Sequence, residues 1–154
     1  MSTTMETLPH ELTAFLLRAK RKTYAGKGAE APVSSRPKSH DLEYEEPGFL
    51  YIDTYLGSRQ FAGQEAVYRD GVPVWAMNYC GVVTGEGFSG DFLKEALLRV
   101  PEDAPFRGPI EYQDGPHLYC NTAAGTPERF MGREEIFQNG VSVYECLYHG
   151  GTLA

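Results

Sequence analysis

The chain has 154 residues, of which 42% are hydrophobic and 23% charged, and its formal net charge is −7. A chain of this length folds as one domain that buries about 70% of its unfolded surface, and no apolar run approaches the roughly 18 residues of a membrane span. We therefore expect one globular domain over residues 1–154, with no membrane association. The first residues lack the pattern of a secretory signal, which predicts a cytoplasmic protein.

The charge is spread unevenly along the chain. Residues 1–40 hold seven Lys or Arg against three Glu, whereas residues 41–154 hold seven against eighteen Asp or Glu. Because the larger, acidic part would repel a phosphate backbone, we expect no direct binding to nucleic acid. The three cysteines, Cys80, Cys120 and Cys146, form no C-x-x-C pair, which is typical of reduced thiols, and we expect each to be buried and inert.

The first predicted element is a helix, in which Leu12, Phe15, Leu16 and Ala19 follow the i, i+3, i+4, i+7 spacing of a buried face. Its last turns hold "RAKRK" (18–22), the only basic cluster. We predict that these cations are solvated and complement the helix dipole, with a phosphate contact as the alternative. The segment at about 27–41 has no periodicity and is rich in Pro, Ser, Gly and Lys. It is predicted to be a flexible insertion, or else a lid over a cleft.

Four strands are predicted to follow. "HDLEYEE" and "FLYIDTYL" flank the turn "EPG", and "QEAVYR" and "VPVWAMNY" flank "DG", a strong hairpin signal. In the last of these strands Trp75, Met77 and Tyr79 share one face, since side chains alternate along a strand. We interpret this stripe mainly as part of the hydrophobic core. Its tryptophan end is also a candidate for the wall of a small-molecule pocket.

A second helix is predicted to start at Ser89 and to end before Pro101, because the residues between them repeat the helical spacing of apolar side chains. The strands "GPIEYQ", "HLYCNT", "REEIFQ" and "VSVYECLY" come next, with "DGP" and "NG" at the turns. The predicted fold class is α+β, with antiparallel strands in one or two sheets and two helices packed on them.

The two halves resemble each other in sequence. Residues 42–81 align with residues 110–150 with one inserted residue near Pro127, and each half begins with a Leu-Leu-Arg phrase in a predicted helix. We interpret the halves as two repeats, at about 10–81 and 89–151, related by pseudo-two-fold symmetry. The identical aligned pairs include Tyr51/Tyr119, Phe61/Phe130, Gly63/Gly132, Glu65/Glu134 and Tyr79/Tyr148.

The phrases "FAGQE" and "FMGRE" suggest a first candidate site. Gly63 and Gly132 are predicted to allow a turn or bulge, with Glu65 and Glu134 at the start of the strands that follow. If the two carboxylates met across the symmetry axis, they would form an acid/base pair. The alternative is that each carboxylate bonds local amides or a tyrosine hydroxyl.

Cys80 and His149 occupy equivalent places in "NYCG" and "LYHG", which suggests a thiol/imidazole pair as a weaker candidate. The four histidines stand at no spacing typical of a zinc site, so no metal is predicted. The sequence also lacks a phosphate-binding loop and a dinucleotide fingerprint, and no cofactor is predicted.

Three strings carry a resemblance to a known family: "FLYIDTYLGSRQFAGQEAVYRDGVPVWAMNYCG", "FSGDFLKEALLRVPEDAPFRGP" and "YECLYHGG". They resemble a bacterial family of domains of unknown function, some of which follow an Xre-type helix-turn-helix. The resemblance extends from the first helix to Gly151. It implies a bacterial cytoplasmic domain associated with transcription regulators, and brings no activity or catalytic residues.

The leading hypothesis is a small-molecule-binding or sensing domain with a groove between its halves. The predicted ligand-binding residues are Trp75, Tyr79, Tyr148, Glu65, Glu134, Tyr51, Tyr119 and His149. An acidic groove rich in aromatic rings predicts a small amphipathic or cationic ligand, held in part by cation–π contacts worth about 0.5–2 kcal/mol each. Two alternatives stay open: an enzyme that uses the paired Glu or Cys80 and His149, which we favour less, and an interaction module, for example a homodimer.

Overall fold

The computed structural model describes residues 9–154; residues 1–8 of the predicted domain lie outside the described part. The first half consists of α1 (His10–Lys22), β1 (His40–Glu46), β2 (Phe49–Gly57), β3 (Gln60–Arg69) and β4 (Val72–Val83). The second half consists of α2 (Gly90–Leu97), β5 (Glu111–Asp114), β6 (His117–Thr126), β7 (Arg129–Gln138) and β8 (Val141–Thr152). Each half is therefore one helix followed by four strands, as predicted.

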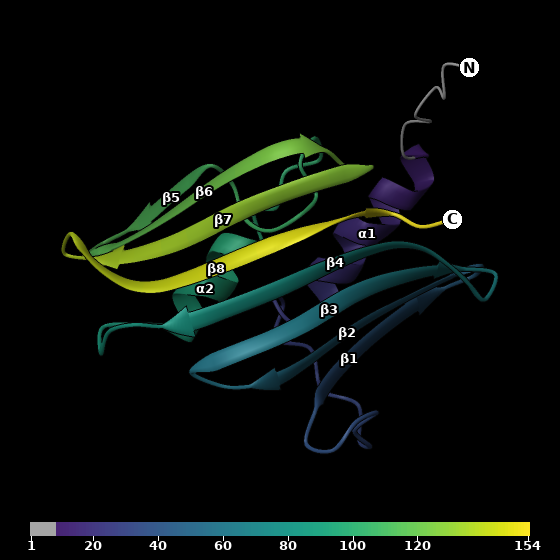
Figure 1. Ribbon diagram of the computed structural model, residues 1–154, viewed down its shortest axis with the longest axis horizontal. Coiled ribbons are helices and arrows are strands. Elements are labelled where there is room, and N and C mark those ends of the chain that lie inside the picture. Colours follow the sequence, from purple (N-terminus) through teal and green to yellow (C-terminus); the bar gives the residue numbers. More distant parts are fainter. Residues whose placement is uncertain (1–8) are drawn as a thin grey trace.

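All eight strands form one antiparallel sheet in the order β1-β2-β3-β4-β8-β7-β6-β5 (Figure 1). The halves join where β4 pairs with β8, and Tyr79 lies directly opposite Tyr148 at the middle of this pairing. The α+β prediction is confirmed, and one continuous sheet resolves the choice between one sheet and two. The duplicated unit and its symmetry stay a prediction from the sequence.

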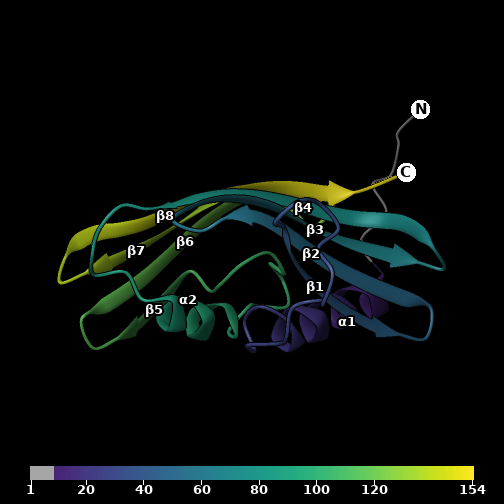
Figure 2. The ribbon, with the colours of Figure 1, turned by 90° about the horizontal axis from the view of Figure 1, so that it is seen from below.

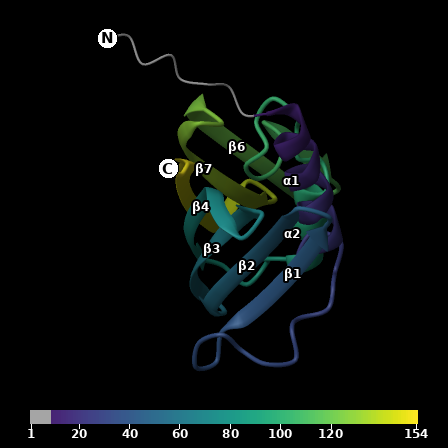
Figure 3. The same ribbon diagram turned by 90° about the vertical axis from the view of Figure 1, so that its right-hand side faces the viewer.

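The sheet is curved, and both helices lie side by side against its concave face (Figures 2 and 3). The predicted helical stripes are confirmed, because the residues that follow the helical spacing are the buried ones. The second helix begins as predicted, since the Ser89 hydroxyl accepts a hydrogen bond from the Phe92 amide. The convex face carries no helix in the described part of the chain.

The two hairpins predicted from "DG" and "NG" are confirmed. Asp70 and Gly71 have φ of 50° and 83°, and Asn139 and Gly140 have 49° and 80°, the left-handed values that a type I′ turn requires. Each of these hairpins also has a register irregularity two or three residues before its turn, between Val67 and Tyr68 in β3 and between Ile136 and Phe137 in β7.

The prediction for the glycines of "FAGQE" and "FMGRE" is wrong. Gly63 and Gly132 lie inside regular stretches of β3 and β7, opposite Tyr79 and Tyr148. A Cβ atom at Gly63 would come within 2.4 Å of the Tyr79 hydroxyl oxygen, and one at Gly132 within 2.2 Å of that of Tyr148. These glycines are needed so that a tyrosine ring can lie flat on the neighbouring strand, and not for a turn.

The predicted insertion is tied to the start of β1. The Asp41 carboxylate accepts hydrogen bonds from the amide and hydroxyl of Ser35 and from the Ser39 hydroxyl, and the Ala31 amide bonds to the Asp41 carbonyl. At the end of the segment, His40 bonds through Nδ1 to Glu30 and stacks on Tyr55. Ser35 and Asp41 lie on the convex side with Thr54, whereas His40 is on the concave side and borders the site described next.

Candidate functional site

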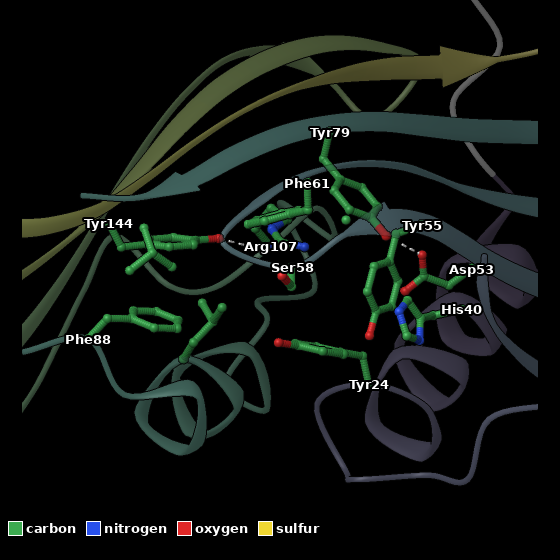
Figure 4. Close-up of a pocket in the computed structure, with 13 residues that line it drawn as sticks. Tyr24, His40, Asp53, Tyr55, Ser58, Phe61, Tyr79, Phe88, Arg107 and Tyr144 are labelled. Atoms are coloured by element: carbon green, nitrogen blue, oxygen red, sulfur yellow. Dashed lines mark hydrogen bonds between the residues drawn. The ribbon is translucent and has the colours of Figure 1, made fainter. Parts of the chain in front are cut away.

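A cavity of about 240 Å³ lies between the concave face of the sheet and the two helices (Figure 4). Its walls are mostly rings, and we call it the aromatic cavity. It is lined by the aromatic residues Tyr24, Tyr55, Phe61, Tyr79, Phe88 and Tyr144, by the polar residues His40, Asp53, Ser58 and Arg107, and by Gly57, Val83 and Leu93.

The pleat of the sheet decides which side chains face this cavity. Asp53 and Tyr55 are two residues apart on β2, so both point to the concave side, and Tyr79 and Val83 do the same from β4. Tyr144 enters from β8 across the β4–β8 pairing. Arg107 comes from the segment after α2, so the cavity combines both halves of the chain.

Asp53 is the most unusual group in the cavity wall. Its side chain is almost fully buried, and its Oδ1 accepts a hydrogen bond of 2.5 Å from the Tyr79 hydroxyl. Within residues 9–154 it forms no salt bridge. Burial, and after it the negative charge of Glu65 on the adjacent strand, raises the pKa of Asp53 to about 7. Asp53 can therefore hold or release a proton near neutral pH.

Glu65 lies behind Asp53 in a first ionic cluster. The Lys20 ammonium donates to Glu65 at 2.9 Å and to the Phe106 carbonyl at 2.7 Å, and the Tyr51 hydroxyl also donates to Glu65. Lys20 is only 7% exposed, and burial lowers its pKa although Glu65 opposes the shift. The prediction of a solvated basic cluster is therefore wrong for Lys20, which belongs to the buried face of α1.

Glu134 anchors a second ionic cluster. The Arg107 guanidinium donates to Glu134 Oε1 through both Nε and Nη2, and the hydroxyls of Tyr119 and Tyr144 donate to the same carboxylate. Burial lowers and Glu134 raises the pKa of Arg107, and the net shift is well upward. The guanidinium is therefore held as a permanent charge in the cavity wall, already matched by Glu134.

These contacts settle where the two predicted carboxylates lie. Glu65 and Glu134 share no hydrogen-bond partner in the described chain, and each has its own cation. The carboxylates that are neighbours are Asp53 and Glu65, which are opposite each other in the β2–β3 register. On the second half, the position opposite Glu134 is Asn121, which is uncharged.

Of the eight predicted ligand-binding residues, Tyr79 alone lines the aromatic cavity. Trp75 is fully buried, stacks on Phe130 at 5.8 Å between ring centroids, and donates its indole N–H to the Pro127 carbonyl. It is core, so the tyrosine end of the stripe, not the tryptophan end, reaches the cavity. Tyr51, Tyr119, Tyr148, Glu65 and Glu134 form the buried layer behind or beside the cavity.

Cys80 and His149 lie on the opposite, convex face. Both are exposed, and in the β4–β8 register Cys80 faces Leu147 while His149 faces Asn78. No hydrogen bond joins them in the described residues. The expectation of a buried thiol is wrong for Cys80. It is confirmed for Cys146, whose pKa burial raises to about 12.

Sequence reasoning missed Asp53, Arg107 and most of the cavity rings. For Asp53 the sequence contains a signal: Asp53 follows Tyr51 by two residues, as Asn121 follows Tyr119, so the aligned halves differ by a charge at this position. For Arg107 it contains none, since only the fold brings the segment after α2 beneath the sheet. In the part of the chain that the structure describes, no three His, Cys, Asp or Glu side chains are arranged to hold a metal ion. Neither described helix is long and apolar enough to cross a membrane.

Comparison with known proteins adds one finding. The model of a family described as a domain of unknown function, DUF5680, matches residues 53–153, from Asp53 in β2 to the residue after β8. Searches of curated proteins and of solved structures gave no match. The matched region covers the strands β3 to β8, α2 and nearly all of the cavity wall. By this match over most of its length, the chain belongs to the DUF5680 family.

Proposed function

We propose that this protein is a small-molecule-binding or sensing module, and that its ligand occupies the aromatic cavity. The observation that carries the proposal is the cavity itself: about 240 Å³ of space walled by six aromatic rings, with a buried carboxylate that has no cation of its own. Ligand pockets combine mostly apolar walls with a few well-positioned polar groups, and pockets for drug-sized compounds have volumes of roughly 300–1,000 Å³. A small amphipathic compound fits this volume and this lining.

The packing of the rings supports the proposal. Phe88 stacks on Tyr144 at 5.2 Å, and Tyr144 stacks on Phe61 at 6.1 Å, so one end of the cavity is a rigid aromatic wall. At the other end His40 stacks on Tyr55 at 4.7 Å beside Asp53. Aromatic walls offer a large contact area at a low cost in side-chain entropy, because each ring has two rotatable bonds.

The test is a thermal-shift screen with a library of small amphipathic compounds, repeated on two variants. Ser58 is exposed in the β2–β3 turn and lines the cavity, so Ser58→Trp should obstruct it. Thr126→Trp places the same side chain at the end of β6, at an exposed position outside the cavity, and serves as the control. We expect compounds that raise the Tm of the wild type and of Thr126→Trp, but not of Ser58→Trp. Equal shifts in all three proteins would place the ligand elsewhere.

A second candidate is acid–base catalysis, favoured by one observation. A carboxyl group with a pKa of about 7, next to a second carboxylate on the adjacent strand, can both accept and return a proton at neutral pH. This moves the paired-carboxylate hypothesis from Glu65 and Glu134 to Asp53 and Glu65. Mass spectrometry of each bound compound after incubation tests it: conversion that requires Asp53 would favour catalysis over binding alone.

A further inference from the structure

We propose that the ligand of the aromatic cavity is a small organic ammonium ion with at least one N–H, that this N–H bonds to the Asp53 carboxylate, and that binding displaces a proton from Asp53. This inference rests on the proposed function, because it names the chemical class that the same cavity would take. It also gives the cavity a response to pH.

The first argument is the charge balance beneath the sheet. The buried ionisable groups at and behind the cavity are two cations, Lys20 and Arg107, and three carboxylates, Asp53, Glu65 and Glu134. Lys20 is matched by Glu65, and Arg107 by Glu134. Asp53 is the carboxylate in excess, and it faces open space. A cation in that space would complete the balance, whereas an anion would add a second unmatched charge.

The second argument is the hydrogen bonding of Asp53. Its carboxylate accepts one hydrogen bond from the Tyr79 hydroxyl, on Oδ1, and has no other donor in the described residues. A buried carboxylate is stabilised by two or three donors, so there is room for a further donor from the ligand. An ammonium N–H supplies both the donor and the charge. A quaternary ammonium ion supplies only the charge.

The third argument is the lining around Asp53. Tyr24 and Tyr55 lie beside it and Phe61 and Tyr144 farther along the cavity, so that a cation near Asp53 has ring faces within reach (Figure 4). Rings of this kind attract cations, and the attraction increases when the pair is desolvated. Two rings of the cavity wall already make this contact: the Lys94 ammonium lies 4.8 Å from the Tyr24 ring centroid, and the Arg107 guanidinium 5.4 Å from that of Tyr79.

The link to protons follows from the groups around Asp53. Burial and Glu65 raise its pKa to about 7, while Tyr79, Arg107 and Lys20 act in the opposite direction. An ammonium ion binds the ionised carboxyl group, so below pH 7 it must displace a proton and its affinity falls. The other titratable groups that line the cavity wall are His40 from β1, Tyr24 after α1, Tyr55 on β2 and Tyr144 on β8. His40 is the histidine among the cavity-wall residues, and it serves as the control position in the test below.

Calorimetry with three probes of one shape tests the proposal: benzylammonium, benzyltrimethylammonium and the neutral benzyl alcohol. We expect benzylammonium to bind most tightly, and its affinity to fall about tenfold from pH 8 to pH 6, in step with the ionised fraction of Asp53. At pH 7, titrations in two buffers with different heats of ionisation should show release of about half a proton for each benzylammonium bound.

Two variants assign the effect to a residue. Asp53→Asn should abolish the pH dependence and proton release and weaken benzylammonium about tenfold or more, but leave benzyl alcohol unchanged. It should fold, since the second half contains the same pair in the form of a 2.6 Å hydrogen bond from Tyr148 to Asn121. His40→Asn should keep both the pH dependence and the proton release.

The outcomes separate this inference from the proposed function. If benzyl alcohol binds as tightly as benzylammonium, or if Asp53→Asn leaves the pH dependence in place, the inference is wrong although the cavity still binds ligands. Tighter binding of benzyltrimethylammonium than of benzylammonium would also overturn it. If the three probes and the screened library all fail to bind, the proposed function falls with it.

Discussion

The aromatic cavity lies mainly against residues of the first half, at the place where the aligned part of the second half is packed with rings. The ring of Phe130, in the second half, stacks on Phe106 at 3.8 Å and on Trp75 of β4 at 5.8 Å between ring centroids. In the first half the aligned residue Phe61 stacks on Tyr144 at 6.1 Å. Tyr24, the aromatic residue that follows the first Leu-Leu-Arg phrase as Phe106 follows the second, lies against Tyr55. The space left between these rings is the aromatic cavity.

The polar groups differ in the same direction. Each half has a tyrosine and a cation on a buried glutamate, through Tyr51, Lys20 and Glu65 in one case and Tyr119, Arg107 and Glu134 in the other. Opposite the glutamate, however, the first half has Asp53, which lines the cavity, and the second half has Asn121. The cluster that both halves share therefore supports the fold, whereas the carboxylate without a cation occurs only where the sheet borders the cavity.

The largest effect is expected for the second ionic cluster. Glu134→Gln leaves the buried Arg107 guanidinium without a counter-ion, and the free energy of unfolding should fall by about 3–5 kcal/mol, as measured by urea denaturation at pH 7. Glu65→Gln should cost less, because burial already lowers the pKa of Lys20, which can lose its proton, and the Phe106 carbonyl still accepts from it. An equal decrease in the free energy of unfolding for Glu134→Gln and Glu65→Gln would contradict this difference between the two clusters.

The rings of Phe106 and Tyr24, which occupy corresponding positions in the two halves, should contribute unequally to the free energy of unfolding. Phe106→Ala removes a 3% exposed ring stacked on Phe130 and should lower the free energy of unfolding by about 3 kcal/mol. Tyr24→Ala removes a half-buried ring that already borders open space, so about 1 kcal/mol is expected. The comparison fails if Tyr24→Ala is the more destabilising of the two in chemical denaturation.

A third effect depends on pH. The pKa of Asp53 is about 7 when folded and about 3.9 in an unfolded chain, so the folded protein holds the extra proton. Its contribution to stability is therefore complete below pH 4 and is lost as the pH rises through 7. Asp53→Asn removes this pH-dependent loss of stability. The free energy of unfolding of the variant minus that of the wild type should therefore increase by about 1–3 kcal/mol from pH 4 to pH 8.

The reciprocal substitution in the second half tests the same difference between Asp53 and Asn121. Asn121→Asp puts a carboxylate opposite Glu134 and removes the amide that donates to the Gly108 carbonyl at 2.9 Å. Its stability relative to the wild type should fall as the pH rises, the opposite slope to Asp53→Asn. A Tm that depends on pH equally in both variants and the wild type would show that neither position titrates on folding.

The helices and strands and their order could be predicted from local patterns in the sequence. Apolar spacing at Leu12, Phe15 and Leu16 located the first helix, Ser89 located the start of the second, and the Asp-Gly and Asn-Gly pairs located two hairpins, because each of these signals acts within a few residues. The alternation in β4 also predicted that Trp75, Met77 and Tyr79 are on one buried face. Local periodicity is enough for these features.

The residues that meet in the candidate site depend on packing between segments that are distant in the sequence. The pairing of β4 with β8 joins the two halves into one sheet, the helices lie on the concave side of that sheet, and Arg107 reaches a wall built mainly by the other half. In the sequence, nothing distinguishes Lys20 from the other cations of "RAKRK". The fold places its ammonium 2.9 Å from the Glu65 carboxylate. The raised pKa of Asp53 has the same origin: burial and neighbouring charges arise from packing between distant segments, which no local pattern in the sequence records.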